Sequence, residues 1–126
     1  MKQYEGYEPL PGQHINGKLT LGENIGDIGG LRIAWAAFQR VLARTGRPAD
    51  IDGFTAEQRF FLGYAQSWRS KIRDEALRLR LNTDPHSPSY HRVLGVLSNA
   101  PEFHDAFACG AEARWWRPED VRPPIW

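Results

Sequence analysis

The sequence is short of cysteines, net charge and long apolar runs, and each shortage excludes a class of protein. Its 126 residues include a single cysteine, Cys109, so no internal disulfide can form. Sixteen Lys and Arg residues nearly cancel fifteen Asp and Glu, which gives no electrostatic reason to expect nucleic acid as a partner. No apolar run approaches the roughly 20 residues that a membrane span needs. We therefore expect a soluble chain, long enough for one domain with a single core.

The pattern that is present predicts a mainly α fold of four to five helices, with an extended N-terminal arm over residues 1–19 and an irregular C-terminal tail. Apolar residues recur at three- and four-residue steps over residues 21–44, which predicts a long helix with a buried stripe. The stripe consists of Ile28, Leu31, Trp35, Phe38 and Leu42. Further helices are expected over residues 55–72, 73–82, 88–99 and 101–109, the first opened by a Thr55–Gln58 capping box and the third by Ser87 as N-cap.

The start of the long helix is unusually rich in glycine. Gly22, Gly26, Gly29 and Gly30 all fall within it. Each glycine inside a helix costs roughly 1 kcal/mol relative to alanine. We expect this cost to be offset by another backbone or side chain that approaches the glycine-bearing face closely.

Two acidic residues lie on the same helix, and their spacing has two interpretations. Glu23 and Asp27 are four residues apart, so both carboxylates project from one side. In the first interpretation, Thr20 is the N-cap, Glu23 closes a capping box and Asp27 is solvated. In the second, Glu23 is a metal ligand and Asp27 orients a histidine ligand supplied from elsewhere. The spacing alone does not separate the two.

The residues around this pair resemble a known family. Gly12-Gln13-His14-Ile15-Asn16-Gly17, followed by Leu19-Thr20-Leu21-Gly22-Glu23-Asn24-Ile25 and Asp27, is similar to the neprilysin and endothelin-converting-enzyme family of zinc metallopeptidases. That family has a glutamate zinc ligand in an E-N-I-A-D sequence, and here Gly26 replaces the alanine. The resemblance continues along nearly the whole chain. It implies that residues 1–126 are the C-terminal helical segment of a zincin-type catalytic domain, with Glu23 as zinc ligand and Asp27 orienting a ligand histidine.

Two further motifs extend the resemblance. Ala65-Gln66-Ser67-Trp68 is similar to a segment that lines the pocket for the substrate side chain beyond the cleaved bond, which implies substrate-binding roles for Ser67 and Trp68. Without the family, Trp68 is simply a core residue. His86-Ser87-Pro88, followed after three residues by Arg92, resembles the pair that acts on substrate carbonyls. His86 would then donate to the oxyanion and Arg92 would bind a carbonyl, whereas the residues alone favour structural roles.

One essential motif is missing. Zinc peptidases of this type take two histidine ligands from an H-E-x-x-H motif, and this sequence contains no such motif. The chain therefore supplies at most one protein ligand to zinc, and we expect it to be catalytically silent alone. In the complete enzyme, zinc held by two upstream histidines and Glu23 would serve the hydrolysis of peptides.

The departures from the family also carry predictions. Vertebrate members have a cysteine where this chain has Arg69, and Cys109 has no partner. The resemblance therefore implies a bacterial-type member. Whether it is cytoplasmic, periplasmic or secreted is left open. We expect His14 to be hydrogen-bonded in a loop, His91 to lie at the surface, and Trp126 to pack structurally as the family's terminal tryptophan does.

Two other functions remain open. The chain could be a non-catalytic helical module that keeps relic family residues and acts through protein contacts. A segment of a larger core exposes apolar surface, so we expect either docking with an upstream half of the domain or self-association as a dimer. An unrelated enzyme built on Glu23, Asp27 and His86 is less favoured, because no nucleophile–base arrangement or phosphate loop is present.

Overall fold

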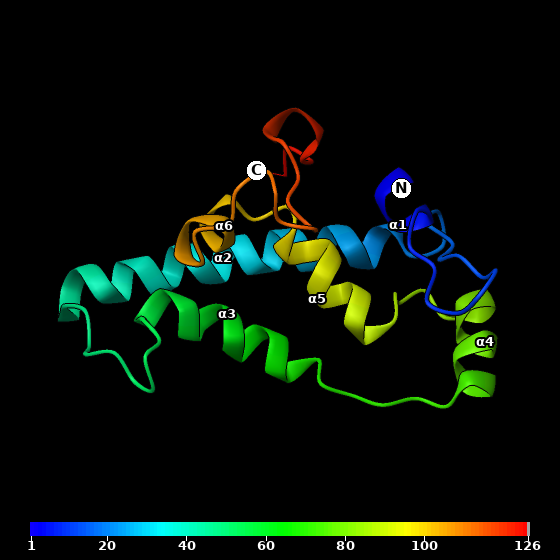
Figure 1. Ribbon diagram of the computed structural model, residues 1–126, viewed down its shortest axis with the longest axis horizontal. Coiled ribbons are helices and arrows are strands. Elements are labelled where there is room, and N and C mark those ends of the chain that lie inside the picture. The colour runs from blue at the N-terminus through cyan, green and yellow to red at the C-terminus, as the bar shows by residue number, and fades with distance from the viewer. Residues whose placement is uncertain (126) are drawn as a thin grey trace.

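The computed structural model describes residues 1–125, and it is mainly helical (Figure 1). Over this range the only β features are two isolated bridges, so the predicted mainly α class is confirmed. The prediction for Trp126 concerns a residue outside the described range. The elements are α1 (Lys2–Glu5), α2 (Leu21–Thr45), α3 (Ala56–Ser67), α4 (Asp74–Thr83), α5 (Ser89–Leu97), α6 (Pro101–Ala106) and the 3-10 turn η1 (Glu119–Val121).

Helix α2 is the axis of the molecule, and α3, α5 and α6 pack along it (Figure 1). The predicted stripe faces the core, with Ile28, Leu31 and Leu42 buried and the two aromatic members partly buried. Trp35 stacks on Phe61, whose side chain is 1% exposed, with ring centroids 4.9 Å apart. Burial of this apolar surface fixes the positions of α3 and α5 against α2.

The N-terminal arm was predicted to be extended, but the short helix α1 forms within it. Tyr4 is buried on this short helix and joins Leu10, Ile15 and Leu81 in a second apolar cluster. The Tyr4 hydroxyl occupies the space that a side chain at Gly95 would fill. Helix α1 therefore packs against α5, and α4 packs against the N-terminal arm. These are tertiary contacts that the local sequence does not reveal.

Three of the predicted helices end early. The Thr55–Gln58 capping box is confirmed, with both of its hydrogen bonds present at 3.0 and 3.1 Å. Helix α3 then ends at Ser67 instead of residue 72, because residues 69–71 are exposed and supply no further core-facing apolar residue. Helix α5 ends at Leu97 instead of 99, and α6 at Ala106 instead of 109, where Ala108 takes a φ of 50°.

The capping box of the first interpretation is absent although Thr20 is the N-cap of α2, and the predicted Ser87 cap is wrong. Thr20 precedes α2, but its hydroxyl donates to the Asn16 carbonyl and accepts from Asn24, so it makes no capping box with Glu23. The Ser87 hydroxyl donates to the Asn24 amide oxygen at 2.8 Å, and Pro88 takes the cap position of α5. The start of α2 is thereby tied to the loop before α5, and the Glu23 carboxylate is left for other contacts.

Three of the four glycines near the start of α2 face open space among the described residues. No atom of the described residues would lie within 4 Å of a Cβ added at Gly22, Gly26 or Gly30, beyond α2's own backbone and the adjacent residues. At these three positions the expected close approach is therefore not made by residues 1–125, whereas Gly29 is buried. Among the described helices, none is both long enough and apolar enough to cross a bilayer.

Candidate active site

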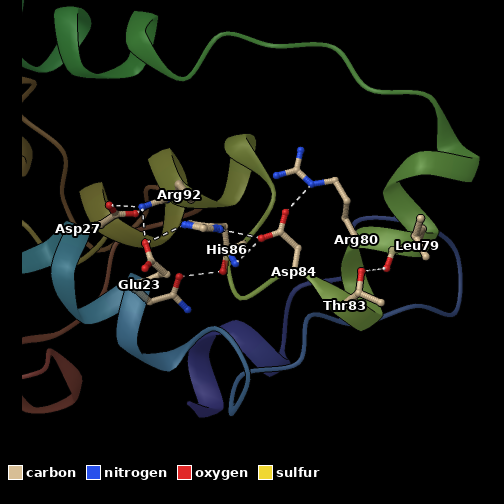
Figure 2. Close-up of polar contacts among 10 residues, drawn as sticks. Glu23, Asp27, Leu79, Arg80, Thr83, Asp84, His86 and Arg92 are labelled. Carbon is tan, nitrogen blue, oxygen red and sulfur yellow. Dashed lines mark hydrogen bonds and ion pairs between the residues drawn. The ribbon is translucent and has the colours of Figure 1, made fainter.

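Glu23 and Asp27 lie one turn apart on α2 and meet Arg92 of α5 (Figure 2). The Arg92 guanidinium donates from Nε to Asp27 Oδ2 at 2.5 Å and from Nη2 to Asp27 Oδ1 at 2.6 Å. Nη2 also lies 3.4 Å from Glu23 Oε2. The Arg92 and Asp27 side chains are 11% and 12% exposed, so this is a two-pronged and largely buried ion pair.

His86 joins the same cluster from the loop before α5. Its Nε2 lies 3.2 Å from Glu23 Oε2, and its Nδ1 lies 2.7 Å from Asp84 Oδ1 (Figure 2). The ring is thus placed between two carboxylates, and an imidazolium would satisfy both with its two N–H groups. The fold therefore brings Glu23, Asp27, His86 and Arg92, which are up to 69 residues apart, into one polar cluster.

Asp84 is the member of this cluster that sequence reasoning missed. Its carboxylate accepts the backbone N–H of His86, the His86 ring and Arg80 Nε at 2.9, 2.7 and 2.7 Å. The backbone hydrogen bond from His86, with the ring and Arg80, holds the pKa of the Asp84 carboxyl at about 2. The available signal was an aspartate two residues before a histidine in a turn, where the side chain accepts the backbone N–H ahead of it.

The two predicted substrate-binding residues have different surroundings. The Arg92 guanidinium lies over the Trp68 ring at 4.1 Å from its centroid, so Trp68 is part of the cluster and not only core packing. The Ser67 hydroxyl is exposed and donates to the Tyr64 carbonyl at 2.7 Å, a contact local to α3. The Tyr64 hydroxyl, also missed from sequence, donates to the Arg92 carbonyl at 3.1 Å, and burial followed by the Asp27 charge raises its pKa.

The remaining histidines discussed above lie outside the cluster. His14 is exposed in the N-terminal arm. The prediction that His91 lies at the surface is wrong, because its side chain is only 8% exposed. It packs between Tyr7 and Tyr90, with ring centroids 5.1 and 5.2 Å away, and burial lowers its pKa to about 4.

The donor set fits one metal ligand, not a complete metal site. Both contacts of the Glu23 carboxylate involve Oε2, and Oε1 makes no hydrogen bond or ion pair with the described residues. A carboxylate with one uncommitted oxygen is a suitable zinc ligand. Across residues 1–125, however, no three His, Cys, Asp or Glu side chains are placed to hold an ion together. Any zinc site that includes Glu23 takes its other ligands from outside this set.

Comparison with known proteins shows the family to which the chain belongs. The family model described as Peptidase family M13 matches residues 1–121, and the chain belongs to that metallopeptidase family. Among curated relatives, Neprilysin-3 of Drosophila melanogaster is 46% identical over 113 residues, and Endothelin-converting enzyme 1 of Homo sapiens is 45% identical over 111 residues. Each match covers 86% of this chain but 14% of the relative, so the chain spans a small part of their length.

A solved structure extends the comparison to three dimensions. The cryo-EM structure of the Mycobacterium tuberculosis zinc metalloprotease Zmp1 in its open state matches with a TM-score of 0.93 and 41% identity. The match covers 99% of this chain and 20% of that one. A crystal structure of Zmp1 with an inhibitor matches with a TM-score of 0.89 and 43% identity. The helical arrangement described above is therefore shared with a zinc metalloprotease.

Proposed function

We propose that residues 1–126 form the C-terminal segment of the catalytic domain of an M13 zinc endopeptidase, in which Glu23 is a zinc ligand. One observation carries the proposal. Glu23, Asp27, His86 and Arg92 were each expected at the active site by family resemblance, and they meet in one cluster drawn from two helices and a loop. A bound zinc ion would supply Lewis acidity toward the peptide carbonyl and toward water.

The chain's own residues would position the substrate and the zinc ligands. Arg92 holds Asp27 with two hydrogen bonds, and each carboxylate oxygen keeps a second lone pair that can accept an N–H from a ligand histidine. His86 presents Nε2 on the Glu23 side, where a protonated nitrogen would donate to a developing oxyanion. Trp68, beneath the Arg92 guanidinium, would form a wall of the substrate side-chain pocket with Ser67 beside it.

The exposed glycines of α2 support the proposal that a second polypeptide packs beside this cluster. Gly26, Gly30 and Asp27 line a groove of about 350 Å³ that continues to Phe60 and Tyr64 of α3. Glycines give a neighbouring backbone room to approach, and Asp27 of the cluster lines this groove. We propose that a polypeptide bearing the two zinc-binding histidines packs here, and that the 126-residue chain alone binds zinc weakly and is inactive.

A chimera tests the proposal. This chain would replace the matching segment of the Zmp1 metalloprotease, and hydrolysis of a fluorogenic peptide would be measured. We expect an active chimera, loss of activity with Glu23→Gln, and a fall in kcat of about 100-fold or more with His86→Phe. Glu57→Gln is the matched control, because Glu57 pairs with Arg47 beyond the other end of α2. Full activity of the Glu23→Gln chimera would overturn the assignment.

Two finer expectations remain predictions. We propose a bacterial-type member, because Arg69 stands where vertebrate members have a cysteine and Cys109 is the single cysteine of the chain. The alternative of a non-catalytic interaction module makes the opposite forecast for the chimera, which would fold and remain inactive. The convergence of the four polar residues favours the peptidase, since an interaction module has no need to align them.

A further inference from the structure

Two pairs of adjacent residues meet where the start of α2 faces the loop before α5. Glu23 and Asn24 are neighbours on α2, and His86 and Ser87 are neighbours in the loop. His86 Nε2 lies 3.2 Å from Glu23 Oε2, and both of these side chains are 42% exposed. The Ser87 hydroxyl donates to Asn24 Oδ1 at 2.8 Å, and these two residues are 2% and 3% exposed. The two segments therefore share one contact that water reaches and one that is buried.

The buried contact is the one that can hold the loop in place. Water competes for both groups of an exposed pair such as His86 and Glu23, so that contact restrains its partners only loosely. The Ser87 hydroxyl and the Asn24 amide have no water to replace a lost partner, so separating them costs the full desolvation of both groups. A loop that moved away from α2 would leave the Asn24 oxygen buried without its donor.

The Asn24 amide is itself held in one orientation. Its Nδ2 donates to Thr20 Oγ1 at 3.0 Å, and the Thr20 hydroxyl donates in turn to the Asn16 carbonyl at 3.0 Å. Because the Thr20 proton is used on Asn16, the Thr20 oxygen accepts from Asn24. The amide oxygen of Asn24 is then left to accept from Ser87. Thr20 is 3% exposed, so buried hydrogen bonds run from the residues before α2 to the loop before α5.

We propose that Asn24 and Ser87 are positioning residues, whose hydrogen bond holds His86 at its distance from Glu23. The bond joins the residue after Glu23 to the residue after His86, so it fixes the loop against α2 beside the contact that matters. Its consequence for catalysis rests on the proposed function. The placement of the loop is a property of this chain and can be measured without zinc or substrate.

Amide hydrogen exchange, followed by NMR on the 126-residue chain, tests the placement of the loop. The backbone N–H groups of His86 and His91 donate to Asp84 Oδ1 and to the Pro88 carbonyl, so they report opening on either side of Ser87. With Ser87→Ala we expect both N–H groups to exchange about tenfold faster, because the loop opens more often once the buried bond is lost.

A second buried serine provides the matched control. Ser98 is 3% exposed and its hydroxyl donates to the Gly95 carbonyl at 3.2 Å, beyond the other end of α5. Ser98→Ala should therefore leave the exchange of the His86 and His91 N–H groups unchanged. Ser87→Cys keeps a weak donor and should give rates between those of the parent and Ser87→Ala.

Equal exchange in the parent and in Ser87→Ala would overturn the proposal. If Ser87→Ala does not fold by circular dichroism, exchange in Ser87→Cys that is no faster than in the parent would overturn it instead.

A double-mutant cycle in the Zmp1 chimera tests the consequence for catalysis. Ser87→Ala and His86→Phe would be made alone and together, with kcat expressed per bound zinc. We expect Ser87→Ala to lower kcat about tenfold in the parent chimera and to have almost no effect in the His86→Phe background, because Ser87 acts through His86. An equal fall in both backgrounds would overturn the positioning role. The exchange measurement needs neither zinc nor the chimera, so this proposal and the proposed function fail separately.

Discussion

Arg92 and Asp27 form a two-pronged ion pair between α5 and α2, with donor–acceptor distances of 2.5 and 2.6 Å. Both side chains are largely buried, and the Arg92 guanidinium lies over the Trp68 ring. Burial alone would lower the pKa of Arg92, but the hydrogen bonds and charge of Asp27 raise it. The pair therefore joins two helices as well as organising the candidate active site.

Removing one partner of this pair should destabilise the chain. Asp27→Ala leaves the largely buried Arg92 charge with only its 3.4 Å contact to Glu23, and we expect a loss of about 3 kcal/mol in the free energy of unfolding. Arg92→Lys should also lose stability, because an ammonium cannot reproduce the planar fork. Urea unfolding followed by circular dichroism measures both. Arg47→Ala is the control, since Arg47 is 68% exposed in its pair with Glu57 and should cost less than about 1 kcal/mol.

The stability of the fold should fall in mild acid because of His91. Its pKa is about 4 in the folded chain and about 6.5 when exposed, so between these values the unfolded state binds a proton that the folded state does not. Stability contributed by neutral His91 is therefore present above about pH 6.5 and is lost as the pH falls toward 4, by on the order of 2 kcal/mol.

His91→Phe should flatten that part of the pH profile. The ring packing between Tyr7 and Tyr90 is kept, and Nδ1 of His91 has no hydrogen-bond partner in the described residues to lose. His14→Gln, at an exposed position, should leave the slope unchanged. Thermal unfolding at a series of pH values makes the comparison, and an equal slope in His91→Phe would contradict the assignment.

Replacing a glycine on the exposed face of α2 should stabilise the 126-residue chain but reduce the activity of the Zmp1 chimera. In the 126-residue chain, Gly26→Ala should stabilise α2 by about 0.5–1 kcal/mol, because the added Cβ meets open space. In the Zmp1 chimera the same change should reduce activity, because the packed polypeptide loses its close approach. Gly46→Ala should destabilise the chain, since Gly46 has a φ of 80°. Unchanged activity in the Gly26→Ala chimera would show that no second backbone lies close to this face.

Association in solution is a further expectation. Ile25, Ile33 and Val41 of α2 are 39%, 63% and 45% exposed, which leaves apolar area on the longest helix. We expect the isolated chain to form dimers at micromolar concentration, because apolar surface of this kind favours contact with another copy. Light scattering on the purified chain measures its mass. A monomer throughout this concentration range would contradict the expectation.

The parts of the fold that were predicted correctly depend on local sequence. The apolar stripe from Ile28 to Leu42 located α2 to within one residue at its C-terminal end, and the Thr55 capping box placed the start of α3. Helix α1 was missed because burial of Tyr4 against Gly95 stabilises it, and His91 was misplaced because the N-terminal arm covers α5. Neither contact has a local signature.

The candidate site likewise has residues that were predicted from the sequence and contacts that were seen only in the structure. The four-residue spacing showed that Glu23 and Asp27 share a side of α2, and the resemblance named His86 and Arg92 as their companions. The two-pronged contact of Arg92 with Asp27 joins residues 65 positions apart, so it could be seen only after folding. Asp84 was missed because its role depends on the turn that places its carboxylate against the His86 ring.

The most direct measurement is the zinc content of three proteins purified in parallel: the 126-residue chain, the Zmp1 chimera and the Glu23→Gln chimera. If Glu23 is a zinc ligand completed by histidines from outside this chain, the chimera will hold one zinc ion, and the other two proteins will hold little or none after dialysis. Tight zinc in the isolated chain, or full zinc in the Glu23→Gln chimera, would show that the ligands have been misassigned.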